Sequence, residues 1–317
     1  MDADADAAGQ GSPAPGAGPG PSGAAVDRMV GAWPVPDAGV AWCALDRTGP
    51  GPAGRPGPLR IVGAAATRFR WASVTKLATA LAILVAVEEG TTALDGPAGP
   101  PGSTVRHLLA HASGLGPDDA SVPVAPPARR RIYSNAGYAV LGRHLADRAG
   151  IPFATYLDEA VLTPLGMTAT RPVDLTGAGG PDLAAAGLAG PVADLAALAR
   201  EWAAPSLISE ATWREATRPQ WPDLDGVLPG FGRFTPCPWG LGPEVRGEKQ
   251  PHWTGRTCSP ATFGHFGQQG AFVWIDPDAG LAVAGAADRS FGPWAARAWP
   301  ELADRLVAAR AGGPGQV

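Results

Sequence analysis

Segments with the pattern of β-strands lie near both ends of this 317-residue chain, and helical patterns fill most of the sequence between them. Residues 39–46 and 59–65 flank a turn rich in Gly and Pro, which predicts a hairpin. Residues 271–275 and 281–286 are joined by a short turn, which predicts a second hairpin. Strands placed this way predict an α+β fold, with one antiparallel sheet built from both chain ends and a helical lobe inserted between them.

The same pattern divides the chain into regions. Residues 1–35 consist largely of Ala, Gly, Pro and Asp, which bury too little apolar surface to fold, so we expect a flexible tail. Residues 36–312 form the folded domain, in which helices are expected over residues 73–89 and 292–311. The expected sheet lobe covers about 36–75 and 237–312, and the expected all-helical lobe covers about 76–236.

Composition excludes several classes of function. The formal charge of −4 and the scattered arginines provide no basic face for nucleic acid. The longest apolar run is too short to cross a bilayer, and the acidic start lacks the form of a secretory signal. We therefore expect a cytoplasmic protein that binds neither nucleic acid nor membrane; separately, we expect a monomer with a small-molecule partner. The three cysteines are widely spaced, so they predict free thiols.

A serine followed three residues later by a lysine is the first chemical signal. The chain has two lysines, and one of them, Lys76, follows Ser73 by one helical turn at the start of the predicted helix. Ser73 alone fits a helix N-cap, but a capping box places Glu or Gln at the third position, where the helix dipole also favours an acid. A desolvated lysine loses its charge and becomes a base, so the pair predicts an activated nucleophile.

A second signal is Tyr133-Ser134-Asn135, which contains the single asparagine of the chain. Together with Ser73-Val74-Thr75-Lys76 and Gly264-His265-Phe266-Gly267, it resembles the three ordered motifs of the serine β-lactamase and penicillin-binding-protein superfamily. The likeness covers roughly residues 38–310 and is greatest to the class C β-lactamase-like and esterase-like branch.

The resemblance implies a role for each matching residue. Ser73 would form an acyl-enzyme, with Lys76 and Tyr133 as the base system, and the pKa of the phenol would be lowered beside a cationic lysine. Asn135 would hydrogen-bond the lysine and the substrate. Site residues from the third motif are His265, which would contribute to the electrostatics, Gly267, which would allow the substrate close to the backbone, and Gln268, whose N–H would complete the oxyanion hole with that of Ser73. No cofactor and no metal are implied.

Other residues invite competing interpretations. Phe266 stands where relatives that cleave β-lactams commonly carry a small hydroxyl residue, which favours a neutral ester or amide substrate. The run Arg129-Arg130-Arg131 fits either an anion contact or a solvated turn. His107 and His111 have the spacing of a zinc pair, but the zincin glutamate is missing and no third ligand is evident.

The sequence therefore predicts a serine hydrolase that cleaves an ester or amide through Ser73. A β-lactamase or D-alanyl-D-alanine peptidase is the alternative within enzymes. A catalytically silent ligand-binding protein of the same fold is the alternative of another class.

Overall fold

The computed structural model describes residues 23–48, 52–173 and 182–311. Its main sheet has seven strands in the order β2-β1-β12-β11-β10-β9, and β3 also pairs with β1. Every pairing is antiparallel, and Ala38 of β1 lies opposite Ala287 of β12, so both ends of the domain meet at the centre of the sheet. Both predicted hairpins and the predicted fold class are confirmed. The strands are β1 (Ala38–Asp46), β2 (Arg55–Pro56), β3 (Arg60–Gly63), β9 (Glu244–Val245), β10 (Phe263–Phe266), β11 (Phe272–Asp276) and β12 (Leu281–Ala287).

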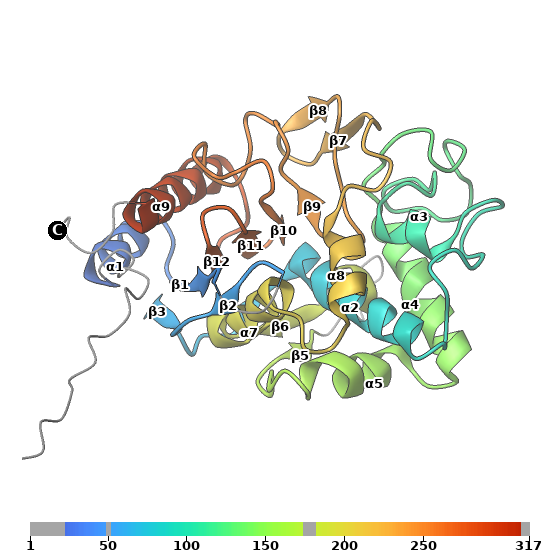
Figure 1. Ribbon diagram of the computed structural model, residues 1–317, viewed down its shortest axis with the longest axis horizontal. Helices are drawn as coiled ribbons and strands as arrows, with labels where there is room; N and C mark the ends of the chain where they lie inside the picture. The colour runs from blue at the N-terminus through green and yellow to red at the C-terminus, as the bar shows by residue number, and fades with distance from the viewer. Residues whose placement is uncertain (1–22, 49–51, 174–181, 312–317) are drawn as a thin grey trace, which may run out of the picture.

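Helices cover both faces of the sheet, and alternate residues along each strand face opposite sides. Val40 and Trp42 belong to the core shared with α1 (Gly23–Gly31) and α9 (Pro293–Ala311), which lie at one end of the molecule (Figure 1). The alternate residues of β1, Ala41 and Cys43, belong to the core on the other face, which is shared with α2 and α7. Because both faces are covered, the central strands are apolar throughout rather than alternating with polar residues.

The helix α1 corrects the expected tail. Residues 1–22 lie outside the described residues, but Gly23–Gly31 is helical, with Val26 and Val30 buried against the sheet. Those two residues are four apart, which places them on one helix face. The surrounding Ala, Gly and Asp obscured this short apolar stripe in the composition of the segment.

The helical lobe is built around α2 (Thr75–Glu88), which is buried on nearly all sides. It ends as predicted, because Gly90 adopts the left-handed conformation that stops a helix. The other helices outside the sheet lobe are α3 (Val105–Leu109), α4 (Asn135–Ala149), α5 (Phe153–Leu157), the π-helical turn η2 (Asp158–Leu162), α6 (Leu183–Ala186), α7 (Val192–Ala203) and α8 (Glu210–Thr217).

The expectation of an all-helical lobe is wrong in two respects. Short strands occur within it: β5 (Arg171–Pro172) and β6 (Leu188–Gly190) form a small sheet with β4 (Phe69–Arg70), and β7 (Gly226–Leu228) pairs with β8 (Gly232–Phe234). In addition, α7 packs on β1, β11 and β12 and so covers a face of the main sheet. Its buried residues repeat at three and four positions, which gives it an apolar face for that contact.

None of the helices in the described part of the chain is long and apolar enough to cross a membrane.

Candidate active site

A cavity of about 270 Å³ lies where the two lobes meet, and five of the seven predicted site residues line it. Ser73 comes from the segment before α2, Tyr133 and Asn135 from the start of α4, and His265 and Gln268 from β10 and the turn after it. Further lining residues are Pro117, Asp118, Leu228, Pro229, Trp239, Glu244 and Phe266.

Ser73 lies in a short 3₁₀ turn (Ala72–Val74) directly before α2. It is not the N-cap of α2, because Val74 holds that position without a side-chain hydrogen bond. Ala72 has a φ of 45°, which costs energy for a residue other than glycine and commonly marks a functional turn. The capping interpretation of Ser73 is therefore wrong.

The structure gives a different reason for a glycine at position 267 from the one expected. A Cβ at this position would lie 2.1 Å from the main-chain oxygen of Trp71, which is closer than any real contact. The lack of a side chain thus lets the end of β10 pack against the backbone two residues before Ser73. Gly267 joins the two halves of the site, and a close approach by substrate is not needed to explain it.

Lys76 is fully buried, and its Nζ has three neighbours. Nζ donates to Asn135 Oδ1 at 2.7 Å and to the Ala185 main-chain oxygen at 2.8 Å, and it lies 3.2 Å from Ser73 Oγ. Burial lowers the pKa of Lys76 to about 7, although the charge of Asp118 acts in the opposite direction. A neutral amine has two N–H groups, and two acceptors take them. The lone pair is then left for the hydroxyl of Ser73.

Asn135 has its amide fixed from both sides. Its Nδ2 donates to Asp118 Oδ1 at 2.8 Å, while its Oδ1 accepts from Lys76. Since a carboxylate can only accept, the amide must turn its oxygen to the lysine. Ser134, between the two site residues, caps α4 by accepting from the N–H of Gly137.

The prediction of a lowered Tyr133 pKa is wrong. The side chain is partly buried, and desolvation of the phenol raises its pKa well above the ordinary value; hydrogen bonding with Ser73 offsets only part of the effect. The prediction assumed a cationic lysine, but Lys76 Nζ lies 4.9 Å from the Tyr133 ring centroid and loses its charge near pH 7. The phenol therefore keeps its proton at neutral pH.

His265 contributes no positive charge to the site. Burial, aided by the nearby Lys76, lowers its pKa to about 3. Its Nδ1 lies 2.7 Å from the main-chain oxygen of Phe266, which requires the proton to be on Nδ1. Nε2 is then an acceptor, and it has no partner among the described residues.

Gln268 and Phe266 lie on either side of Gly267 at the end of β10. The main-chain N–H of Gln268 donates to no other group within the described residues, so it is available to a substrate oxygen. Phe266 is 7% exposed and packs among aromatic rings, with Phe291 at 4.8 Å and Trp253 at 5.6 Å between centroids. Phe266 therefore adds an apolar side chain to the cavity lining.

Glu244 is a lining residue that sequence reasoning missed. Its carboxylate is 2% exposed and pairs with Lys249 Nζ at 2.9 Å and with His252 Nε2 at 2.9 Å, and it accepts from Trp253 Nε1 at 2.5 Å. Despite burial, these partners hold the pKa of Glu244 well below its usual range. The one available signal was the rarity of lysine, which singled out Lys249 as well as Lys76.

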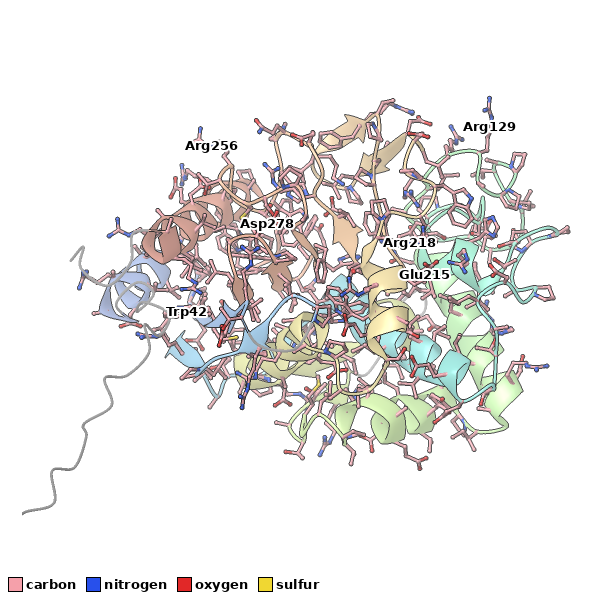
Figure 2. All side chains as sticks on the ribbon, viewed as in Figure 1. Trp42, Arg129, Glu215, Arg218, Arg256 and Asp278 are labelled. Carbon is pink, nitrogen blue, oxygen red and sulfur yellow. The ribbon has the colours of Figure 1, made fainter. Side chains whose placement is uncertain are left out.

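The arginine run divides into exposed and buried members. Arg129 lies at the periphery of the molecule (Figure 2). Arg131 is 2% exposed and donates to the main-chain oxygens of Ala110, Cys237 and Gln220. It ties the segment before Tyr133 to the rest of the lobe, and none of the three arginines lines the cavity.

The two histidines with zinc-like spacing have separate environments. His107 Nδ1 lies 2.8 Å from Thr104 Oγ1, while His111 Nδ1 accepts from the N–H of Ser134 at 3.1 Å. The His111 ring also packs on Tyr133, with 4.5 Å between centroids. No group of three potential metal ligands occurs in the described parts of the chain.

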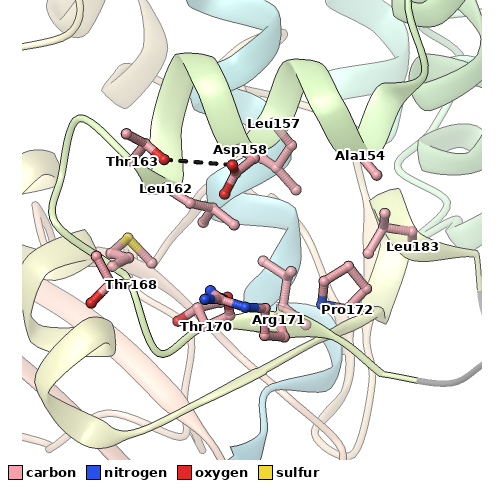
Figure 3. A pocket seen from close by; sticks show the side chains of 12 residues that line it. Ala154, Leu157, Asp158, Leu162, Thr163, Thr168, Thr170, Arg171, Pro172 and Leu183 are labelled. Atoms are coloured by element: carbon pink, nitrogen blue, oxygen red, sulfur yellow. Dashed lines mark hydrogen bonds between the residues drawn. The ribbon is translucent and has the colours of Figure 1, made fainter.

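Two larger cavities contain none of the predicted catalytic residues. One, of about 370 Å³, lies between η2 and β5, with Leu157, Leu162 and Arg171 among its lining residues (Figure 3). The other, of about 500 Å³, lies beside α9, with Arg246 and Asp304 in its lining. Size alone therefore does not single out the candidate site; the smaller cavity is lined by Ser73, whose Oγ lies 3.2 Å from the buried Lys76 Nζ.

Comparison with known proteins points to one group. The sequence profile of a protein family described as Beta-lactamase matches residues 62–308. A search of the curated proteins found no match.

Several solved structures resemble the chain. A crystal structure described as a beta-lactamase from Mycobacterium bovis has 46% identity and a TM-score of 0.81, over 90% of this chain and 99% of the other. EstCE1, described as a hydrolase with promiscuous acyltransferase activity, has 18% identity and a TM-score of 0.67, over 90% and 97% of the two chains. A D-stereospecific amidohydrolase from Streptomyces sp. has 17% identity and a TM-score of 0.63, over 92% and 98%. The last two show likeness of fold alone.

Proposed function

Because this chain belongs to the beta-lactamase family, whose structural neighbours are hydrolases, we propose that it is a serine hydrolase that cleaves an ester or amide through an acyl-enzyme on Ser73. One observation carries the proposal. Lys76 Nζ is buried 3.2 Å from Ser73 Oγ, with both of its N–H groups directed to other acceptors. This arrangement suits a neutral amine that removes the proton from the serine hydroxyl.

Acylation follows from these contacts. Ser73 Oγ attacks the carbonyl carbon while its proton passes to Lys76 Nζ, and the N–H groups of Ser73 and Gln268 bind the developing oxyanion. Each such donor typically contributes about 10²–10³-fold to the rate. The bond to the leaving group then breaks, and the proton held by Lys76 reaches the leaving oxygen or nitrogen through the phenol of Tyr133.

The raised pKa of Tyr133 supports a role as a proton relay. A phenol that does not ionise at neutral pH relays protons, accepting one as it donates its own, and does not act as a standing phenolate. Deacylation uses the same path in the opposite direction. Water gives a proton to neutral Lys76 through Tyr133 and attacks the acyl carbon, and Ser73 recovers its proton as the acid product leaves.

A fluorophosphonate probe tests the proposal. It is expected to add a covalent mass to the peptide that contains Ser73, and Ser73→Ala is expected to abolish the addition. Ser121→Ala changes an exposed serine outside the cavity lining and is expected to label like the unmodified protein. Labelling that persists in Ser73→Ala would refute the assignment. A folded protein that never acylates would instead support the catalytically silent binding protein.

A second candidate is a β-lactamase, favoured by the 46% identity to the Mycobacterium bovis protein. Two features of the cavity weigh against it. Phe266 offers no hydroxyl for a carboxylate, and the cavity lining contains no lysine or arginine. Turnover of a chromogenic cephalosporin far above that of a nitrophenyl ester would reverse this preference, and the same comparison with a D-alanyl-D-alanine peptide decides the peptidase alternative.

A further inference from the structure

The lining of the catalytic cavity has two acidic side chains, Asp118 and Glu244, and no lysine or arginine. Their environments differ. Glu244 is buried and already compensated by Lys249, with further hydrogen bonds from His252 and Trp253. Asp118 is exposed and is one of the residues that line the cavity, and no cationic side chain of the described residues forms a salt bridge with it. Asp118 is thus the uncompensated charge of this cavity.

The Asp118 carboxylate has an oxygen to spare. Oδ1 accepts from Asn135 Nδ2 at 2.8 Å, and Oδ2 accepts from no group within the described residues. Because the hydrogen bond fixes the carboxyl group, Oδ2 is held in place to receive a donor from a ligand.

Asp118 is also close to the reaction centre. Asn135 bonds Lys76 at 2.7 Å, and Lys76 lies 3.2 Å from the nucleophile, so two side chains connect the carboxylate with Ser73. Asp118 and Ser73 also line the same cavity, so a single substrate can contact both.

The remaining groups of the cavity do not oppose this negative charge. His265 is neutral near pH 7, since its pKa is about 3, and Lys76, which is not a lining residue, is about half neutral at pH 7 and more so above it. A carboxylate without a cationic partner in the cavity lining attracts a cation and disfavours an anion. The expectation of a neutral substrate, which considered only Phe266, left this charge out.

We propose that Asp118 binds a protonated amine on the acyl portion of the substrate, so that the preferred substrates are esters or amides of amino acids or short peptides with a free amine. The proposal rests on the serine hydrolase function above and names its substrate class. A charge-assisted hydrogen bond of an ammonium to a carboxylate is stronger than a neutral one and selects charge as well as shape.

A substrate series that differs in charge tests the proposal. Alanine nitroanilide with a free amine, its N-acetyl form and its N-succinyl form carry a cation, no charge and an anion near the scissile bond. At pH 7 the α-amine is mostly protonated, since its pKa is about 7.7–8.0. Both enantiomers are assayed. The expected kcat/KM is about tenfold higher for the free amine than for the N-acetyl form, a ratio that corresponds to one favourable charge-assisted contact.

Two variants assign the effect to the carboxylate. Asp118→Asn is expected to remove the preference for the free amine, so that the ratio of the two kcat/KM values falls to about one. Asp119→Asn is the matched control, because this neighbouring carboxylate bonds the N–H of Ser121 and does not line the cavity. It is expected to keep the tenfold ratio. Equal treatment of amine and N-acetyl substrates, or a preference that survives Asp118→Asn, would overturn the proposal.

A competition assay covers the case in which anilides react too slowly. Alaninamide is expected to inhibit hydrolysis of nitrophenyl butyrate more strongly than N-acetylalaninamide, and Asp118→Asn is expected to remove the difference; equal inhibition counts against the proposal. The two proposals fail differently. Fluorophosphonate labelling of Ser73 without any amine preference refutes only the substrate class, whereas absence of labelling refutes the hydrolase itself.

Discussion

The surroundings of the two lysines, Lys76 and Lys249, show how partners decide what a buried amine does. Both side chains are almost completely shielded from water. Lys249 pairs with the carboxylate of Glu244 and also donates to the main-chain oxygens of Pro238 and Val245. Lys76 meets only neutral groups, Ser73, Asn135 and the oxygen of Ala185.

The difference teaches that burial alone does not make a base. Desolvation penalises the charged form of any amine, but a carboxylate in contact restores it. Without a contacting carboxylate, the pKa of Lys76 falls to about 7, where the amine can exchange protons at neutral pH. Where the carboxylate is present, the pair instead anchors β9 and the segment that follows it.

Removing the amine from the first lysine gives the largest expected change. Lys76→Met is expected to lower kcat/KM by about 10³-fold, because general-base catalysis contributes roughly 10²–10⁴-fold. The loss of two hydrogen bonds is expected to cost only about 1–3 kcal/mol of stability. Ester hydrolysis and chemical denaturation measure the two effects. A variant that keeps its activity would show that Lys76 is not the base.

Removing the amine of Lys249 is expected to affect stability more than activity, the opposite of the effect at Lys76. Lys249→Met leaves the Glu244 carboxylate buried without its cation, so the free energy of unfolding is expected to fall by about 3–5 kcal/mol. Urea denaturation measures it. The double variant Lys249→Met with Glu244→Gln removes both charges and is expected to recover much of the loss. If Lys249→Met alone were as stable as the parent protein, the proposed difference between a structural Lys249 and a catalytic Lys76 would be refuted.

The pH dependence is a finer test of the same distinction. Lys76 acts as a base only when neutral, so kcat/KM is expected to rise with pH up to its pKa of about 7 and then level off. Because the Asp118 charge raises the pKa of Lys76, Asp118→Asn is expected to shift this acid limb to lower pH. A neutral substrate such as nitrophenyl butyrate separates the shift from substrate charge. The assignment would be contradicted if the acid limb of the Asp118→Asn profile moved to higher pH, or if the parent protein showed no acid limb between pH 5 and 8.

The lowered pKa of Lys76 also makes the free energy of unfolding depend on pH. In the unfolded chain a lysine titrates near 10.4, so between about pH 7 and 10.4 the unfolded state binds more protons than the folded one. Stability therefore contains a contribution that is present above the unfolded pKa and is lost as the pH falls toward 7. Lys76→Met is expected to remove this part of the pH dependence.

The parts of the site that the sequence predicted are those marked by rare residues in a fixed order. Ser73, Lys76, Tyr133, Asn135 and His265 do come together, although their roles are still proposals. The sign of the Tyr133 shift was not accessible, because it depends on how completely Lys76 is desolvated. Asp118 was overlooked for a similar reason: an aspartate in a Gly/Pro-rich loop has no local pattern, and only the folded chain brings it to Asn135.

The fold shows the same limit. The strands of the two hairpins were predictable because their apolar runs are bounded by turns, whereas the two- and three-residue strands β4 to β8 are too short to leave such a pattern. The helix α1 was hidden by its composition, and the position of α7 on the sheet is a tertiary choice that its amphipathic pattern does not specify. The cytoplasmic location and the monomeric state stay predictions.

The pairing of β1 with β12 has a consequence for the order of events during protein synthesis. The first strand leaves the ribosome long before its central neighbour exists, and Ser73 likewise precedes the β10 segment that supplies His265 and Gln268. Such distant pairings close large loops and form late. A nascent chain thus carries Ser73 and Lys76 without the β10 side of the cavity, and the complete cavity is assembled only once translation of the domain is nearly finished.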